Sequence, residues 1–211
     1  MKPPRVVLVD DHAVVRSGYR RLLELEESVE VVAEFGDGES AYAWLARNAA
    51  DVLVLDLSMP GRGGLDTLAR LKQRQPALRV LVFTMHDSAA MVTQALRAGA
   101  DGYLTKSSSP DLLVEAIRRV MHGERVLSED VRRQGGGARD AALAPHQVLT
   151  PREFEIFRRL VEGAAVDVIA QTLCLSPKTV ANYQTVIRQK LGVESPVEML
   201  RLAQQHGLAG R

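Results

Sequence analysis

Hydrophobic positions in the first 122 residues alternate between short continuous runs and longer amphipathic stretches. Apolar runs typical of strands occupy residues 5–9, 29–33, 52–55, 80–83 and 102–104. Three of these runs are almost continuously aliphatic, as expected of strands that helices cover on both faces. Apolar residues at helical spacing fill the stretches between and after them. The pattern predicts an α/β doubly wound fold, a (βα)5 unit around a parallel sheet.

The pattern changes after residue 123. Small and polar residues, including Gly135-Gly136-Gly137, fill residues 132–145 and predict a flexible linker. From Leu149 the apolar spacing is purely helical. Helices are expected at about residues 152–162, 166–173, 177–191 and 197–206. We therefore predict a first domain at 1–122, a linker at 123–147 and an all-α four-helix domain at 148–211.

Helix starts in the second domain carry clear capping signals. Thr150-Pro151-Arg152-Glu153 and Ser195-Pro196-Val197-Glu198 each combine an N-cap residue, a first-turn proline and a glutamate three residues after the cap. Both are predicted to be capping boxes. Ser176-Pro177 predicts a third start, without the glutamate.

Composition narrows the class of protein. The 211 residues are 46% hydrophobic and 25% charged, which excludes a long disordered chain. The single cysteine, Cys174, cannot form an internal disulfide and is expected to be a small buried hydrophobic residue. The N-terminus has no long apolar segment and no run reaches membrane-spanning length. We expect a cytoplasmic protein with no membrane partner.

Charge is nearly balanced, with 27 Lys+Arg against 26 Asp+Glu and a formal net charge of +1. This balance excludes non-specific electrostatic coating of nucleic acid. Residues 149–211 hold 8 basic and 6 acidic residues, so the second domain is only weakly basic.

Candidate chemistry in the first domain lies where the predicted strands end. The acids Asp10 and Asp11 follow the first strand, Asp56 the third, Thr84 the fourth and Lys106 the fifth. In an open parallel sheet these ends line one crevice. Any one strand-end aspartate is commonly a turn former or a helix cap. Their joint placement favours a shared acid pocket.

Three acids in one pocket repel one another unless a cation is present. Oxygen ligands with few other donors suit Mg2+, which retains several waters. A lysine and a hydroxyl nearby suit phosphoryl oxygens. With an aspartate as nucleophile, the set indicates formation of an aspartyl phosphate.

These positions resemble the receiver domain of two-component response regulators over about residues 4–122. The motifs are Val6-Val7-Leu8-Val9-Asp10-Asp11-His12, Leu55-Asp56-Leu57-Ser58-Met59-Pro60-Gly61, Val82-Phe83-Thr84-Met85-His86-Asp87 and Gly99-Ala100-Asp101-Gly102-Tyr103-Leu104-Thr105-Lys106. Gly63 departs from the family, which often has aspartate there.

The resemblance implies a role for each matching residue. Asp56 would be the phosphoacceptor, and Asp11, Asp56 and the Ser58 carbonyl would bind Mg2+. Asp10 would act largely through a coordinated water. The remaining roles are the phosphoryl-pairing Lys106, the switch hydroxyl Thr84 and the switch aromatic Tyr103. His12 is expected to cap the first helix.

In the second domain, residues 166–173, a turn at Cys174-Leu175 and residues 177–191 have the proportions of a helix-turn-helix. One face of the second helix is apolar, and Tyr183 belongs to it. The other face carries amide, hydroxyl and cationic groups that can read base edges and phosphates. On pattern alone, a four-helix module with an ordinary solvated face is an equal alternative.

Leu149-Thr150-Pro151-Arg152-Glu153, Ile169-Ala170, Leu175-Ser176-Pro177-Lys178-Thr179-Val180 and Arg188-Gln189-Lys190-Leu191-Gly192-Val193 resemble the LuxR-type DNA-binding domain, over about residues 148–208. Both resemblances together imply a transcriptional regulator of the NarL/FixJ family. Ala181 and Tyr183 replace a lysine and a histidine frequent in that family. The predicted DNA contacts are Lys178, Thr179, Asn182, Thr185 and Arg188.

The expected partners are a sensor histidine kinase, a double-stranded DNA operator and, on phosphorylation, a second copy of the chain. The protein would be no enzyme beyond its own phosphotransfer and dephosphorylation. Before phosphorylation, the receiver is expected to cover the recognition helix. Two alternatives stay open. A haloacid dehalogenase-type phosphohydrolase would need an aspartate where Ser58 stands, and a protein-binding adaptor without DNA contact is supported only by Ala181.

Overall fold

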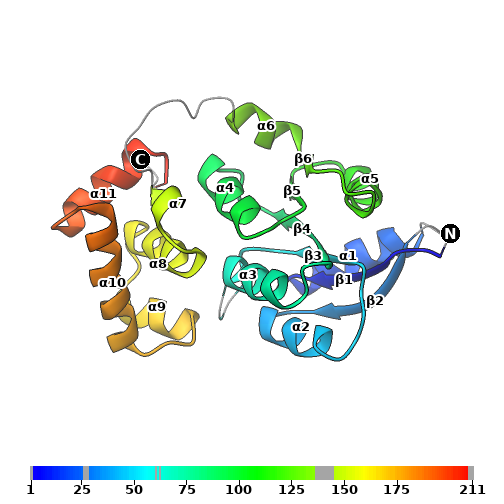
Figure 1. Ribbon diagram of the computed structural model, residues 1–211, viewed down its shortest axis with the longest axis horizontal. Coiled ribbons are helices and arrows are strands. Elements are labelled where there is room, and N and C mark those ends of the chain that lie inside the picture. The colour runs from blue at the N-terminus through cyan, green and yellow to red at the C-terminus, as the bar shows by residue number, and fades with distance from the viewer. Residues whose placement is uncertain (1, 26–28, 60, 62, 136–144, 209–211) are drawn as a thin grey trace.

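A computed structural model describes residues 2–25, 29–59, 61, 63–135 and 145–208. Figure 1 shows a sheet flanked by helices, beside a purely helical part that contains the C-terminus. The structure thus has the predicted α/β followed by all-α architecture. Residues 136–144 of the predicted linker lie outside the described residues.

All strands of the sheet run parallel, in the order β2-β1-β3-β4-β5-β6. Their bounds are β1 Arg5–Val9, β2 Glu30–Phe35, β3 Val52–Leu55, β4 Arg79–Thr84, β5 Gly102–Thr105 and β6 Val126–Leu127. The described part of the chain therefore has six strands where the sequence predicts five. The additional strand has only two residues, too few to show a periodic pattern.

Helices cover both faces of the sheet. On one face, Leu23 of α1 and Ile117 of α5 pack against Leu8 and Phe83. On the other, α2, α3 and α4 cover a second apolar layer. The bounds are α1 Ala13–Glu24, α2 Gly38–Leu45, α3 Gly64–Arg74, α4 Ala89–Arg97 and α5 Pro110–Met121. Burial on both faces explains the continuously aliphatic strands.

The helical part contains the four predicted helices and, before them, a short helix that begins within the predicted linker. Its elements are α7 Pro145–Val148, α8 Pro151–Val161, α9 Val166–Thr172, α10 Pro177–Leu191 and α11 Pro196–Gln205. Phe154, Phe157 and Ile187 are fully buried at its centre. A further helix, α6 Glu129–Gly135, follows β6 within the predicted linker.

Two local predictions for the second domain need correction. Thr150 and Glu153 form the predicted reciprocal capping box, but Ser195 forms half of one. Ser195 accepts the Glu198 N–H, whereas Glu198 Oε2 accepts the N–H of Glu194 instead of the cap residue. Cys174 is exposed, not buried, because its left-handed backbone, at φ 52°, turns the chain between α9 and α10.

Within the described residues, every helix is too short or too polar to cross a membrane.

Candidate functional site

Strand register brings the predicted acid pocket together. Val9 of β1 pairs with Leu55 of β3, so Asp10 and Asp56 leave neighbouring strands at the same edge of the sheet. The Asp56 N–H donates to the Val9 carbonyl at 2.9 Å and fixes this juncture. Asp56 is 2% exposed and Asp10 is also buried. One edge of the sheet therefore concentrates negative charge out of water.

Lys106 bridges the two buried carboxylates. Thr84 of β4 pairs with Thr105 of β5, which places Lys106 just beyond the strand ends. Its Nζ lies 2.6 Å from Asp56 Oδ2 and 2.6 Å from Asp10 Oδ2, and its side chain is 7% exposed. This one ammonium group is the positive centre of the acid pocket.

Burial alone would raise the pKa of Asp56, but bonds from Lys106 and from the Ser58 N–H outweigh it and lower that pKa. Burial likewise opposes the charge of Lys106, yet Asp10 and Asp56 raise its pKa. Both groups are therefore charged at neutral pH. Asp56 is held as a carboxylate, the form that a nucleophile requires.

The hydroxyl-bearing residues border the same pocket. Asp56 Oδ1 accepts the Ser58 N–H at 3.0 Å, and Ser58 Oγ lies 3.4 Å from Thr84 Oγ1. Tyr103 is fully buried and donates its hydroxyl to the His86 carbonyl at 2.8 Å. Burial raises the pKa of Tyr103, so its hydroxyl stays a neutral donor. Thr84 and Tyr103 are thus joined through the short segment that contains His86.

The acids also present a set of ligand atoms for a cation. Oxygens of Asp10, Asp11 and Asp56, with a nitrogen of His12, all lie within 4.8 Å of one another. Asp11 Oδ1 is buried, and the His12 ring nitrogen Nδ1 lies 2.9 Å from it. Carboxylate oxygens grouped this closely fit the coordination of Mg2+. The residues present therefore suit the predicted metal.

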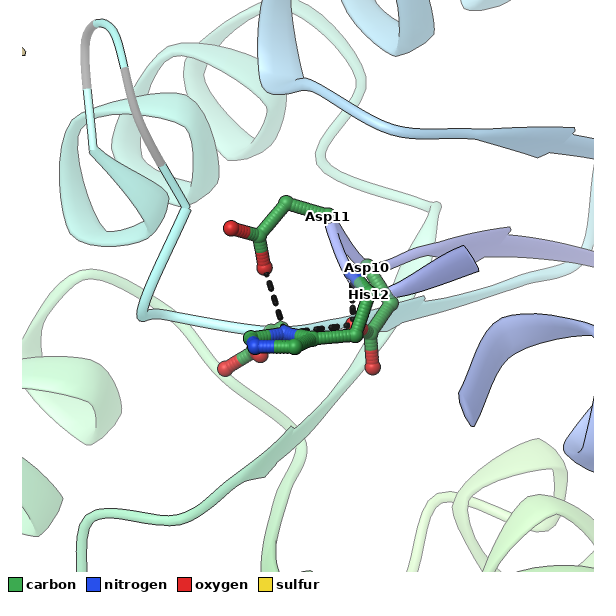
Figure 2. A group of neighbouring side chains, drawn as sticks. Asp10, Asp11 and His12 are labelled. Carbon is green, nitrogen blue, oxygen red and sulfur yellow. Dashed lines mark hydrogen bonds and ion pairs between the residues drawn. The ribbon is translucent and has the colours of Figure 1, made fainter. Parts of the chain in front are cut away.

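His12 does not have the role expected from the sequence. It occupies the N-cap position of α1, but its side chain makes no capping hydrogen bond. Its Nδ1 lies 2.9 Å from Asp11 Oδ1 and 3.5 Å from Asp10 Oδ1, as Figure 2 shows. The imidazole therefore faces the acid pocket and not the end of the helix.

Helix α10 presents the second candidate surface. Val180 and Ile187 are buried on its inner face, and Tyr183 packs beside them as predicted. Lys178, Asn182 and Thr185 are exposed on the outer face, and Arg188 is half-buried. Thr179 is committed to the helix start, because its N–H and hydroxyl both contact Ser176 Oγ. Among these residues, the outer face therefore presents one amide, Asn182, and one fully exposed cation, Lys178.

Comparison with known proteins tests the assignments of both domains of the chain. Residues 6–118 match the family described as response regulator receiver domain, and residues 147–203 match the bacterial regulatory proteins of the luxR family. The chain belongs to the NarL/FixJ-family response regulators. It is a two-component regulator with a DNA-binding transcription factor role.

Relatives extend this assignment over nearly the whole chain. The response regulator UvrY of Escherichia coli K12 is 37% identical over 206 residues, covering 96% of this chain and 94% of its own. The transcriptional regulatory protein UhpA of the same organism is 41% identical over 196 residues, covering 93% and 95%. RcsB of Salmonella enterica serovar Typhimurium, bound to promoter P1flhDC with BeF3−, gives a TM-score of 0.69 at 31% identity, covering 97% and 100%.

In this response regulator the receiver does not cover the recognition helix, so that expectation is wrong for the arrangement seen. Helix α3 packs on α8, and α4 packs on α7, as Figure 1 shows. Lys178, Asn182 and Thr185 on the outer face of α10 stay exposed within the part of the chain that the structure describes. Sequence reasoning missed this contact, since Gln94, which donates to the Leu149 carbonyl at 3.1 Å, lies in an ordinary amphipathic helix and carries no motif.

Proposed function

We propose that this response regulator is switched by Mg2+-dependent phosphorylation of Asp56 from a phosphohistidine of a sensor kinase. The supporting observation is the Lys106 ammonium group, 2.6 Å from both Asp56 and Asp10. It keeps Asp56 ionised. The other carboxylate oxygen of Asp56, Oδ1, accepts the Ser58 N–H and so holds the loop that follows β3.

In the reaction, a carboxylate oxygen of Asp56 attacks phosphorus and the phosphorus–nitrogen bond of the phosphohistidine breaks. The imidazole nitrogen leaves with the electron pair. Lys106 pairs with the phosphoryl oxygens and limits the build-up of charge beside Asp10. Mg2+, held by Asp11, Asp56 and the Ser58 carbonyl, would add positive charge against the same oxygens.

The switch follows from the hydroxyl groups beside Asp56. Without the phosphoryl group, Thr84 Oγ1 lies 3.4 Å from Ser58 Oγ. After phosphorylation, Thr84 moves toward the phosphoryl group, because its oxygens are strong hydrogen-bond acceptors. Its shift carries the His86 segment, whose carbonyl accepts the Tyr103 hydroxyl. A local charge change thereby becomes a rearrangement of one surface of the receiver.

The output is proposed to be a dimer on DNA. The second domain is only weakly basic, so a single copy has few phosphate contacts and binds DNA weakly. Pairing of two copies presents two recognition helices to two half-sites. Similar RcsB, at 31% identity and a TM-score of 0.63, is described as two dimers bound to two parallel DNAs.

Labelling with a small-molecule phosphodonor tests the site. Wild type, Asp56→Asn and Asp111→Asn are incubated with acetyl phosphate and Mg2+, and hydroxylamine-sensitive label and sedimentation are measured. Asp111 is an exposed acid in the first turn of α5 and serves as the matched control. Label and dimer are expected in wild type and in Asp111→Asn only. Equal labelling of Asp56→Asn would overturn the assignment.

A further inference from the structure

Lys106 lies in a tight turn that follows β5. Its N–H donates to the Thr84 carbonyl at 2.8 Å, and the Ser108 N–H donates to the Thr105 carbonyl at 3.0 Å. These bonds fix the path of the main chain. The ammonium group, however, sits at the end of a flexible four-carbon side chain, whose ordering costs conformational entropy. A small displacement of the turn is therefore enough to move the ammonium group away from the two carboxylates of the acid pocket.

Asp130 of α6 holds both neighbours of Lys106. Thr105 Oγ1 donates to Asp130 Oδ2 at 2.5 Å, and Ser107 Oγ donates to the same oxygen at 3.3 Å. The two hydroxyl oxygens also lie 2.8 Å from each other. Thr105 is 2% exposed, so its hydroxyl has to find its partner inside the protein. One carboxylate oxygen thus ties down the residues on either side of Lys106.

Strand β6 and helix α6 place Asp130 beside this turn. Leu127 of β6 pairs with Tyr103 of β5, and the Ser128 N–H donates to the Tyr103 carbonyl at 3.1 Å. The chain then enters α6, and Asp130 lies in the first turn of that helix. The short strand that the sequence pattern does not predict therefore carries a carboxylate to the end of β5.

Asp130 is ionised in this position. Burial alone would raise its pKa, but the nearby Ser128 and Thr105 hydroxyls outweigh burial and lower that pKa. Hydrogen bonds from a hydroxyl to a carboxylate are short, at about 2.5–2.7 Å, and about twice as strong as those between neutral groups. The contact between Thr105 and Asp130 has this length. It is the strongest tie between α6 and the turn.

We propose that Asp130 is a positioning residue of the phosphotransfer site. By holding Thr105 and Ser107, it keeps the Lys106 ammonium group between Asp10 and Asp56. Asp130 acts only through Lys106 and has no contact of its own with the reacting groups. Its effect on the rate of labelling rests on the proposed phosphoacceptor role of Asp56, whereas its effect on Lys106 does not.

The first test reads Lys106 in the full chain before any phosphodonor is added. Exchange of the ammonium hydrogens is measured by NMR, and the signal is assigned by its loss in Lys106→Met. In Asp130→Ala we expect this exchange to become about tenfold faster or more. The ammonium group of Lys72, which pairs with Asp101 at 3.0 Å elsewhere in the receiver, is the internal reference and should keep its wild-type exchange. General loosening of the fold would accelerate both signals.

The second test measures labelling by acetyl phosphate and Mg2+. Asp130→Ala should slow labelling about tenfold, because a displaced ammonium group neutralises less charge in the transition state. Asp111→Asn, which removes an exposed acid from the first turn of α5, is the control and should label as wild type.

A matched pair of variants approaches the same contact from its donor. Thr105→Val keeps the shape of the side chain but removes the hydroxyl, so it should reproduce the faster Lys106 exchange and the slower labelling. Thr105→Ser keeps the hydroxyl and should restore both. Combined with Asp130→Ala, Thr105→Val should add less than its separate effect, because the two residues act through one hydrogen bond.

The outcomes distinguish the positioning role from the proposed function. Unchanged Lys106 exchange in Asp130→Ala, equal acceleration at Lys72, or full additivity with Thr105→Val would overturn the positioning role. Faster exchange with unchanged labelling would overturn its contribution to phosphotransfer. Absence of label in wild type would refute the phosphoacceptor and leave the exchange result standing. If Asp130→Ala fails to fold, Asp130→Asn, which keeps an acceptor oxygen without the charge, must show the same changes to a smaller extent.

Discussion

The acid pocket and the outer face of α10 are built in opposite ways. In the pocket, Asp10 and Asp56 are buried, and the Lys106 ammonium group lies 2.6 Å from a carboxylate oxygen of each. On α10, the side chains of Lys178 and Asn182 extend into solvent. The first site is assembled before its ligand arrives. The second is open to solvent, and no such ion pair holds Lys178 or Asn182 among the described residues.

The acid pocket and the outer face of α10 therefore differ in what fixes their specificity. A buried lysine between two carboxylates has one stable arrangement, because any displacement leaves a charge unpaired in a low dielectric. An exposed helix face has no such constraint, and in the proposed dimer its selectivity would depend on a second copy and on half-site spacing. In the proposed function, phosphorylation of the fixed site organises the adaptable one.

The largest effect is expected when the fixed site loses its cation. Lys106→Met leaves Asp10 and Asp56 adjacent without their shared ammonium group, and labelling of Asp56 by acetyl phosphate should slow about 100-fold. The matched control is Lys72→Met, since Lys72 pairs with Asp101 at 3.0 Å elsewhere in the receiver. Labelling of the control should stay near wild type. Wild-type rates in Lys106→Met would show that the pocket is not organised as described.

The strand-end residues could be predicted because the chain itself encodes their convergence. Parallel strands place their carboxyl ends at one edge, so Asp10, Asp56 and Thr84 need only follow three strands to share a site. The helix starts at Thr150 and Ser176 could also be predicted from the sequence, since a cap depends on residues three positions apart.

Other features of the structure depend on contacts that the local sequence pattern does not predict. Gln94 finds its acceptor in Leu149, 55 residues away, across a domain contact. Strand β6 forms because β5 offers it an edge, not because Val126–Leu127 has a strand pattern of its own. Cys174 is exposed through its backbone angle, which its apolar side chain does not indicate.

On the adaptable surface, the next largest effect is expected at Asn182. An exposed amide on a recognition helix reads base edges, so Asn182→Ala should cost about 1–3 kcal/mol of binding and relax selectivity at one base pair. Affinity is measured by titration against DNA selected from a random pool by the wild-type chain. Gln204→Ala, an exposed amide on α11, is the control and should bind as wild type. Equal affinities for all three proteins would remove Asn182 from the interface.

Lys178 should behave differently from Asn182, because a cation that contacts phosphate carries no sequence information. Lys178→Ala is expected to weaken binding to every DNA alike and to reduce the slope of log affinity against log salt by about one. The salt series is compared with Arg201→Ala, an exposed cation on α11. A slope that changes equally in both variants would mean general electrostatics, not a contact by Lys178.

The smallest effect concerns a second lysine–carboxylate pair, which sharpens the comparison between buried and exposed charge. Lys190 of α10 lies 2.7 Å from Glu153 Oε2, in the capping box of α8. Its side chain is 37% exposed, against 7% for Lys106, so water screens this pair far more. Glu153→Gln should therefore destabilise the second domain by only about 1 kcal/mol at pH 7.

The pH dependence distinguishes this pair from simple capping. Burial alone would raise the pKa of Glu153, but Lys190 and the Thr150 N–H lower it below the ordinary 4.5. A lowered pKa in the folded state gives stabilisation that is complete above 4.5 and disappears as pH falls through the folded value. The difference between wild type and Glu153→Gln, measured by amide exchange in α8, should shrink on acidification over that range. Glu198→Gln, at the half-formed box of α11, alters an exposed cap with no lysine partner among the described residues and should change exchange less. If both variants behaved alike, Lys190 would add nothing to the cap, and charge pairing would matter only in the buried pocket.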